Sequence, residues 1–437
     1  MTRNMGYALL AGVAALVVLI STAIFIGLRG ESGALDSALP SGDQGNAQPA
    51  SSGKWIGTWS APAVAAEPRS ERGLANMSIR NVVHTSVGGT AARITLSNLY
   101  GTRPLTISHA SVALAAAPSN PTVASGSMRR LTFDNRRSVT IPPGAQAVSD
   151  GVRLNVPHAA DLLVTTYSPT PSGPVTYHPY ARQTSYVARG DQTEQVAGTS
   201  FTQPSPYWRY LTAVDVWSQE TQGAVAVLGD SITDGISSSP GANRRWTDFL
   251  AERLRTERAA PRYSVLNGGI SGNRVLVDGS RFSPNNGPSA LRRAERDALS
   301  QSGVRAVVIE LGLNDIIKLP RQRDPEQIVA GLRKLVDRAH AKGLRVVGGT
   351  LTPFGGHRGY QPQLDAVRQQ VNERIRNGKI FDAVVDFDAA LRDPAQPDRL
   401  RAAYDSGDHL HPSDNGYQAM AQALDLRLLK GSTQAKL

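Results

Sequence analysis

The distribution of apolar positions along the chain divides it into segments with different expected structures. Residues 7–28 contain no charged side chain, and their number matches the roughly 20 residues that a helix needs to cross a bilayer. A cleaved secretory signal has a shorter apolar region and a small-x-small cleavage site, and no Ala-x-Ala follows Leu28. We therefore expect residues 1–28 to be a transmembrane anchor rather than a signal segment. The rest of the chain is then expected outside the cytoplasm, periplasmic or extracellular, and secreted if the segment is cleaved.

Residues 29–53 have a different composition. Ser, Gly, Ala and Pro dominate this stretch. Such a segment cannot bury enough apolar surface to offset the entropy that ordering costs. The composition predicts a flexible linker.

Residues 54–222 show the pattern expected of an all-β domain. Short runs rich in β-branched residues alternate in polarity, and turn residues such as Gly, Pro and Asn separate them. The clearest runs are residues 77–83, 92–96, 152–156 and 162–167. No helical period stands out, so the pattern predicts a β-sandwich domain of the jelly-roll type.

Apolar runs alternate with helical segments over residues 223–437. Continuous apolar runs are typical of parallel strands that are covered on both faces. The runs are residues 224–228, 265–266, 306–311, 344–348 and 383–385. This alternation predicts an α/β domain with a parallel sheet.

One predicted helix, over residues 325–342, has well-marked ends. Asp324 stands at the N-cap, Gln327 at the capping-box position and Gly343 just past the end. Another helix is expected to begin near residues 413–414. Both helices carry an apolar stripe, which predicts that one face of each packs against the sheet.

Polar blocks follow three of the predicted strands directly. Residues 229–235 follow the first strand, 267–274 the second and 312–315 the third, while 408–412 lie near the C-terminus. Sites in parallel α/β sheets lie beyond the carboxyl ends of the strands. We therefore expect the four blocks to bring Ser, Gly, Asn, Asp and His side chains to one edge of the sheet.

These residue types are the ones that acyl transfer requires. A serine hydroxyl becomes a good nucleophile when a base takes its proton, and a histidine oriented by a carboxylate can be that base. Backbone N–H groups and a side-chain amide can stabilise the oxyanion of the tetrahedral intermediate. Each block alone is a common turn sequence, but four of them in order at strand ends favour a serine hydrolase.

The four blocks resemble those of the SGNH, or GDSL-type, hydrolase family: Gly-Asp-Ser, the glycine of Ile-Ser-Gly-Asn, Gly-x-Asn-Asp and Asp-x-x-His. The resemblance covers about residues 224–429. It implies a flavodoxin-like three-layer α/β/α fold and no metal or other cofactor. It also implies that Ser231 is the nucleophile, that His411 is the base and that Asp408 orients it. The oxyanion hole would comprise the backbone N–H groups of Ser231 and Gly272 and the amide of Asn314.

The last block holds two histidines. Only His411 stands three residues after Asp408 and directly before Pro412, as the family pattern requires. We therefore expect His411 to be the base and His409 to line the cleft or to be an ordinary loop residue.

Other polar residues of these blocks are interpreted as supporting residues. We expect Asp230, Asp234 and Asp315 to hold loops rather than to transfer protons. The α/β-hydrolase elbow, Gly-x-Ser-x-Gly, does not fit, because Thr233 stands two residues after the candidate nucleophile.

Composition and charge exclude several classes of protein. The chain has no cysteine, so disulfides, thiolate metal sites and thiol nucleophiles are excluded. Its formal net charge is +11, but Lys and Arg are scattered and form no long basic run, so we expect no nucleic-acid partner. The histidines of residues 54–222 lack metal-ligand spacing, and no metal is expected there.

The predicted β-domain contains aromatic residues with two interpretations. A β-sandwich before such a hydrolase resembles bacterial secreted GDSL esterases, including some carbohydrate acetylesterases. The aromatic residues could stack on sugars or could pack in the core and at the interface. They are Trp55, Trp59, Tyr177, Tyr180 and Trp208.

The expected activity is the hydrolysis of carboxylic esters with short, acetyl-type acyl groups, and the expected substrate is a small ester or an acylated carbohydrate. No long apolar lid occurs in residues 223–437, and the loop 352–357 is expected to border the pocket. Three alternatives remain: a lysophospholipase-like or lipase-like esterase, an acyltransferase on envelope polysaccharide, and a non-catalytic glycan-binding surface protein.

Overall fold

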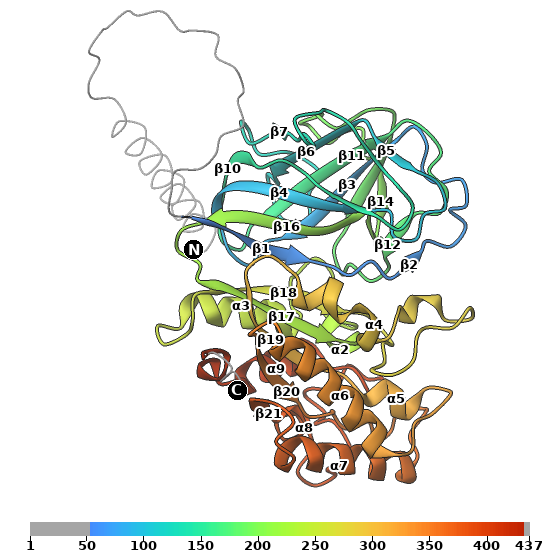
Figure 1. Cartoon of the computed structure of the whole chain (residues 1–437), viewed down its shortest axis with the longest axis vertical. Helices are drawn as coiled ribbons and strands as arrows, with labels where there is room; N and C mark the ends of the chain where they lie inside the picture. Colours follow the sequence, from blue (N-terminus) through green and yellow to red (C-terminus); the bar gives the residue numbers. More distant parts are fainter. Residues whose placement is uncertain (1–52, 432–437) are drawn as a thin grey trace, which may run out of the picture. The chain divides into compact units, whose positions relative to one another are not determined.

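A computed structural model describes residues 53–431 (Figure 1). The predicted anchor at 1–28 and nearly all of the predicted linker lie outside the described residues. Within residues 53–431, no helix is both long and apolar enough to span a membrane. The described residues belong to a single compact unit.

The first part of the described chain is rich in antiparallel strands, as predicted. One sheet has the order β1 (Lys54–Ser60), β16 (Leu211–Ser218), β4 (Gly89–Ser97), β10 (Val152–Val156), with β9 (Gln146–Val148) also on β4. A second sheet has the order β14 (Gln203–Ser205), β13 (Ser185–Arg189), β3 (Met77–His84), β11 (Asp161–Ser168), β6 (His109–Leu114), β7 (Arg129–Arg130). Two small sheets are β15 (Trp208–Arg209), β12 (Thr176–His178), β2 (Ala65–Ala66) and β5 (Leu105–Ile107), β8 (Val139–Ile141).

The two larger sheets share one hydrophobic core. Ile94 and Leu96 of β4 and Ile79 and Val83 of β3 are buried in the same cluster. Burial of one face of each sheet against the other is the arrangement of a sandwich.

The second part of the described chain contains a parallel sheet. Its strand order is β18 (Tyr263–Gly269), β17 (Gly223–Gly229), β19 (Val304–Glu310), β20 (Arg345–Gly349), β21 (Ala383–Val385). In sequence order this is 2-1-3-4-5, the order of flavodoxin-like sheets. The five predicted strands are confirmed, and every residue of the central β17 is buried.

Helices cover both faces of this sheet (Figure 1). Ala226 and Leu228 of β17 share a core with α6, whereas Val225 and Val227 share another with α3 and α9. The helices are α2 (Ser231–Asp234), α3 (Trp246–Thr256), α4 (Ala290–Ala294), α5 (Leu313–Ile317), α6 (Pro325–His340), α7 (Pro362–Asn377), α8 (Phe387–Leu391) and α9 (Asp414–Ala423). Short turns are η1 (Pro284–Asn286), the π-helical η2 (Glu295–Leu299) and η3 (Leu426–Leu429). The predicted three-layer α/β/α fold is therefore present.

The ends of α6 follow the prediction in part. The Asp324 side chain accepts from the backbone N–H of Glu326, and Gly343 has a φ of 70° just beyond the helix. The predicted capping-box bond from Gln327 is wrong, because the backbone N–H of Asp324 donates to the side chain of Gln322 instead. The helix also ends at His340, two residues before the predicted end.

The strand-rich part is bonded directly to the parallel sheet. The backbone N–H of Gly57 in β1 donates to the carbonyl of Ser302 at 2.9 Å, and the Ser264 hydroxyl in β18 donates to the Gly57 carbonyl at 2.6 Å. A Cβ atom on residue 57 would collide with Leu266, so glycine allows β1 to lie against β18. The contact places the strand-rich part beside the strand that precedes the Gly272 loop.

Candidate active site

Ser231 begins a short helix at the carboxyl end of the central strand. The side chain of Asp230 accepts from the backbone N–H of Ile232 at 3.0 Å and so caps α2. Gly229, the last residue of β17, has no space for a side chain, because a Cβ atom there would collide with Thr233. After this tight turn, Ser231 lines a cleft, and 8% of the surface of this residue is exposed.

Three residues that sequence analysis assigned to one site lie together. His411 Nε2 is 2.9 Å from Ser231 Oγ, although 180 positions separate the two residues. His411 Nδ1 is 2.6 Å from Asp408 Oδ2. This is the geometry of a nucleophile, a base and a carboxylate that fixes the base.

The carboxylate of Asp408 is well supported. Its Oδ1 atom accepts from the backbone N–H groups of His411 at 2.8 Å and Leu410 at 2.9 Å. Partial burial raises its pKa, but the hydrogen bonds from the ring and backbone of His411 outweigh burial and hold this pKa below its ordinary range. Asp408 is therefore ionised at neutral pH.

His409 is positioned differently from His411. Its Nδ1 atom is 2.5 Å from Asp405 Oδ2, and its side chain is 49% exposed. Its ring lines the cleft but makes no hydrogen bond to Ser231. The structure therefore brings His411, and not His409, to the serine.

Gly272 and Asn314 border the same cleft as Ser231. Gly272 lies in the loop after β18 with a φ of 77°, which strains any residue with a side chain. Asn314, in α5, donates one N–H of its amide to Asp230 Oδ2 at 2.8 Å. An amide carries two N–H groups, so the second stays available to an oxygen in the cleft.

A pair of buried carboxyl groups, Asp230 and Glu310, lies next to Ser231. Glu310, the last residue of β19, is 2% exposed and accepts a hydrogen bond from the Thr233 hydroxyl at 3.0 Å. Burial and the neighbouring Asp230 raise the pKa of Glu310 well above its ordinary value. Burial also raises the pKa of Asp230 to about 6, although the hydrogen bond from the Ile232 N–H acts to lower this pKa. Sequence analysis missed Glu310, although an acidic residue in the otherwise apolar run 306–311 was the available signal.

Asp234 and Asp315 hold loops, as expected. Asp234 Oδ2 accepts from the backbone N–H of Ser271 at 2.9 Å and from its hydroxyl at 2.5 Å. Asp315 accepts from the backbone N–H groups of Val275 at 2.8 Å and Leu276 at 3.0 Å. Both carboxylates therefore fix the segment that carries Gly272.

The cleft around Ser231 has a volume of about 890 Å³. The predicted loop 352–357 contributes Gly356 and His357 to its wall. Other lining residues occur in segments without a motif and were not predicted: Ile236, Asn285, Asn286, Ile317, Lys318 and Arg358. Among residues 53–431, no group of three or more His, Asp or Glu side chains is arranged to hold a metal ion.

Only one of the five aromatic candidates reaches this cleft. Trp59 and Trp208 are buried and form an edge-to-face pair with centroids 4.9 Å apart, and Tyr177 is 3% exposed. Trp55 packs edge-to-face on Trp217. Tyr180 is 41% exposed and lines the cleft from the strand-rich part. The core interpretation therefore holds for the three buried residues, whereas Tyr180 faces the site.

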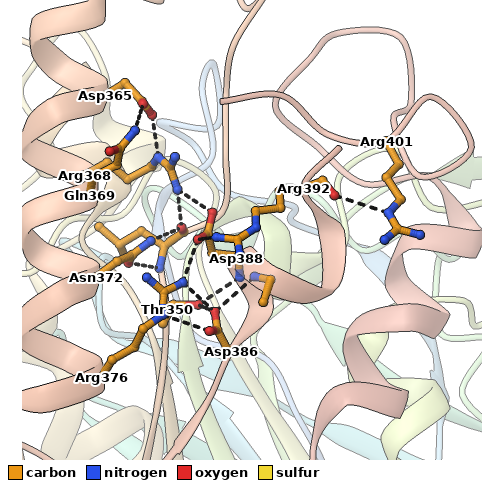
Figure 2. A network of polar contacts seen from close by, with 12 residues as sticks. Thr350, Asp365, Arg368, Gln369, Asn372, Arg376, Asp386, Asp388, Arg392 and Arg401 are labelled. Carbon is orange, nitrogen blue, oxygen red and sulfur yellow. Dashed lines mark hydrogen bonds and ion pairs between the residues drawn. The ribbon is translucent and has the colours of Figure 1, made fainter. Parts of the chain in front are cut away.

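A buried ionic network fixes the loop after β20 (Figure 2). Arg368 of α7 is 1% exposed and bonds to Asp365, to Asp388 and to the carbonyl of Leu351 at 2.7, 2.7 and 3.1 Å. The Asn372 amide bonds to both the N–H and the carbonyl of Leu351. These charges and amides fix the backbone of Leu351, at the start of the loop that leads to Gly356 and His357.

The sheet order, the serine at the end of β17 and the facing histidine define a serine hydrolase with a three-layer α/β/α fold. Residues 227–419 match the family model described as GDSL-like Lipase/Acylhydrolase. This part of the chain is a domain of the GDSL-like lipase/acylhydrolase family, and the protein is accordingly a serine ester hydrolase.

Several solved structures are similar to parts of the chain. A member of the lipolytic protein G-D-S-L family from Veillonella parvula DSM 2008 is 21% identical, over 46% of this chain and 94% of that one, with a TM-score of 0.31. An acetylxylan esterase from Geobacillus stearothermophilus is 23% identical, over 48% and 94%, with a TM-score of 0.36. A family two carbohydrate esterase from Clostridium thermocellum, in complex with cellohexaose, is 14% identical, over 85% and 92%, with a TM-score of 0.35. No curated protein matches the chain.

Proposed function

We propose that the protein hydrolyses carboxylic esters through an acyl-enzyme on Ser231, with His411 as the base and Asp408 as the carboxylate that orients it. The observation that carries this proposal is the position of His411, whose two ring nitrogens bridge Ser231 Oγ and Asp408 Oδ2 at 2.9 and 2.6 Å. An ionised Asp408 keeps a proton on Nδ1, so Nε2 is free to accept the serine proton.

In the first half-reaction, Ser231 Oγ bonds to the ester carbonyl carbon while its proton passes to His411 Nε2. The carbonyl π electrons move to oxygen, and the N–H groups of Ser231, Gly272 and Asn314 stabilise this oxyanion. The intermediate then collapses, the bond to the alkoxide breaks, and His411 gives its proton to the departing alkoxide. The products of this half are an alcohol and the acyl-enzyme.

Water reverses the sequence in the second half-reaction. His411 takes a proton from water, and the resulting hydroxide oxygen bonds to the acyl carbon. The bond from that carbon to Ser231 Oγ breaks, and His411 returns the proton to the serine. A carboxylic acid leaves and the enzyme is restored. Asp408 stabilises the imidazolium formed in both halves.

The proposed substrate is a short acyl ester of a carbohydrate. The half-exposed ring of Tyr180 supports this, because an aromatic face beside polar groups suits a sugar ring. Tyr180→Ala is expected to raise KM for acetylated xylan, while Tyr180→Phe, which keeps the ring, retains the wild-type KM. Equal KM values for acetylated xylan in wild type and Tyr180→Ala would contradict this substrate assignment.

The catalytic proposal is tested with a fluorophosphonate probe and p-nitrophenyl acetate. Ser231→Ala is expected to abolish labelling and to reduce turnover to background, because within residues 53–431 no other hydroxyl is bonded to His411. Ser300→Ala is the matched control, since Ser300 is exposed and does not line the cleft. Wild-type labelling or turnover in Ser231→Ala would refute the proposal.

We also propose that residues 1–28 anchor the chain in a membrane with the catalytic part outside the cytoplasm. The uncharged length of residues 7–28 supports this. The full chain is expected to resist extraction from membranes by alkaline carbonate and to be digested by protease added to spheroplasts, in which both a periplasmic and an extracellular domain are accessible. Release by carbonate would contradict the anchor, and protection from the protease in spheroplasts would contradict the orientation.

A further inference from the structure

Lys318 lies in the catalytic cleft without a carboxylate partner. It follows α5 directly, is half-buried, and lines the same cleft as Ser231. Its ammonium donates to Asn286 Oδ1 at 3.3 Å, and within the described part of the chain it forms no ion pair. Removing an ammonium group from water without a paired anion is unfavourable, which points to a ligand that completes the contact.

The ammonium of Lys318 stands beside the proposed oxyanion hole. A Cβ atom on Gly272 would collide with both Lys318 Nζ and Asn286 Oδ1. The missing side chain of Gly272 thus lets the ammonium and the amide oxygen lie against its backbone. Burial lowers the pKa of Lys318, while the charge of Asp230 opposes this shift.

The part of the cleft beside His411 has a different character. A Cβ atom on Gly356 would lie 3.1 Å from the ring of His409, and the charges of Asp408 and His411 both act on His357. These residues therefore form one group of neighbours in the cleft, and Lys318, Asn286 and Gly272 form another.

The proposed mechanism orients the ester between these two groups. His411 must reach the alkoxide to protonate it, so the alcohol part of the ester belongs beside the histidines. The carbonyl oxygen belongs at the proposed donors Gly272 and Asn314. This leaves the acyl substituent to the part of the cleft that Lys318 lines.

We infer that Lys318 determines acyl specificity: its ammonium favours short acyl groups and acyl groups that end in a carboxylate, and it disfavours long apolar chains. This inference rests on the proposed function. A long alkyl chain would remove the remaining water from the ammonium without replacing its hydrogen bonds. A terminal carboxylate would supply the missing anion in a charge-assisted hydrogen bond.

Two pairs of p-nitrophenyl esters test the inference on the whole enzyme. The glutarate half-ester and the pentanoate have equally long acyl chains and differ in charge, while the octanoate and the acetate differ in apolar length. In Lys318→Met, the glutarate-to-pentanoate ratio of kcat/KM is expected to fall about ten-fold. The octanoate-to-acetate ratio is expected to rise about ten-fold, through a lower KM for octanoate.

Two variants serve as controls. Lys318→Arg retains the charge and is expected to keep wild-type ratios. Lys334→Met removes an exposed lysine of α6 outside the cleft and is also expected to keep them. The thermal midpoint of each variant, compared with wild type, verifies that the ratios come from folded enzyme.

The outcomes separate this inference from the catalytic proposal. Ratios in Lys318→Met that stay within about two-fold of wild type would overturn the inference, since that corresponds to a negligible free-energy difference. An equal loss of kcat on all four esters would also overturn it, because it would assign Lys318 to the oxyanion instead. Turnover that survives in Ser231→Ala would refute the catalytic proposal itself.

Discussion

The buried side chain of His178 joins the strand-rich part of the chain to the turn that follows Ser231. His178 Nε2 is 2.9 Å from Asp234 Oδ1, and its Nδ1 atom is 3.0 Å from the carbonyl of Pro62. Both ring nitrogens therefore have an oxygen partner, and the ring is held from two sides. Asp234 also accepts from Ser271, so this contact connects the strand-rich part to the loop that carries the proposed oxyanion donor.

Replacement of His178 by Leu is expected to destabilise the protein. The change keeps most of the side-chain volume but removes the hydrogen bond from the ring to the buried carboxylate of Asp234, which costs about 1–3 kcal/mol. Urea unfolding measures this loss. His340→Leu is the control, because His340 pairs with Asp382 near the surface and such pairs contribute about 0–1 kcal/mol. Equal unfolding free energies in the two variants would contradict a structural role for the buried pair.

Loss of the Asn314 amide is expected to slow catalysis rather than binding. Asn314→Ala removes one proposed oxyanion donor, so kcat for p-nitrophenyl acetate should fall by about 10²–10³-fold with little change in KM. The amide is oriented by Asp230 at 2.8 Å, and the variant leaves that carboxylate in place. A loss of only a few-fold in kcat would show that the oxyanion does not depend on Asn314.

The two histidines near the C-terminus are expected to differ sharply. His411→Asn removes the base and should lower kcat by about 10⁴-fold or more. His409→Asn, the matched change two residues away, removes only a ring that is bonded to Asp405 and should keep kcat within about ten-fold of wild type. Steady-state kinetics on p-nitrophenyl acetate distinguishes them. The reverse ranking would assign the base to His409.

Asp315 is expected to make stability depend on pH. Burial raises its pKa from 3.8 to about 6, against the hydrogen bonds from Val275 and Leu276. Between these pH values the folded state binds more protons than the unfolded state, so this group lowers the free energy of unfolding as pH rises from about 4 to 6. Above pH 6 both states are ionised and the contribution of this group is constant.

Asp315→Asn removes this titration while an amide oxygen remains to accept a backbone N–H. Urea unfolding at pH 4, 5, 6 and 7 is expected to show a free-energy difference between variant and wild type that changes in favour of the variant between pH 4 and 6. A difference that is constant over that range would contradict the raised pKa.

The order of elements could be read from local pattern. The run 224–228 is apolar at every position, as a strand covered on both faces must be, and β17 is buried throughout. The carboxyl ends of parallel strands converge on one edge, which brought the blocks of Ser231, Gly272 and Asn314 together. The block of His411 follows no predicted strand, and its pairing with Ser231 was implied by the resemblance to the SGNH family. Catalytic residues that belong to motifs at strand ends could therefore be predicted from the sequence.

Residues of loops that line the cleft could not be predicted from strand-end motifs. Tyr180 and Lys318 belong to no motif, and no periodicity relates them to Ser231. The start of α6 also shows the limit of local signals. The capping-box pattern predicted that the backbone N–H of Asp324 donates to the side chain of Gln327, but it donates to the side chain of Gln322. Which of two side chains accepts a given backbone hydrogen bond depends on the conformation of the whole segment.

The class of chemistry and the sheet that supports it could be predicted from the sequence, because apolar periodicity and strand-end motifs are local properties. The residues that surround the catalytic serine in space are set by the tertiary structure. It placed Lys318 beside Gly272 and joined His178 to Asp234, contacts between segments far apart in the chain. Such contacts depend on how loops pack on a finished sheet, and no local pattern encodes that packing.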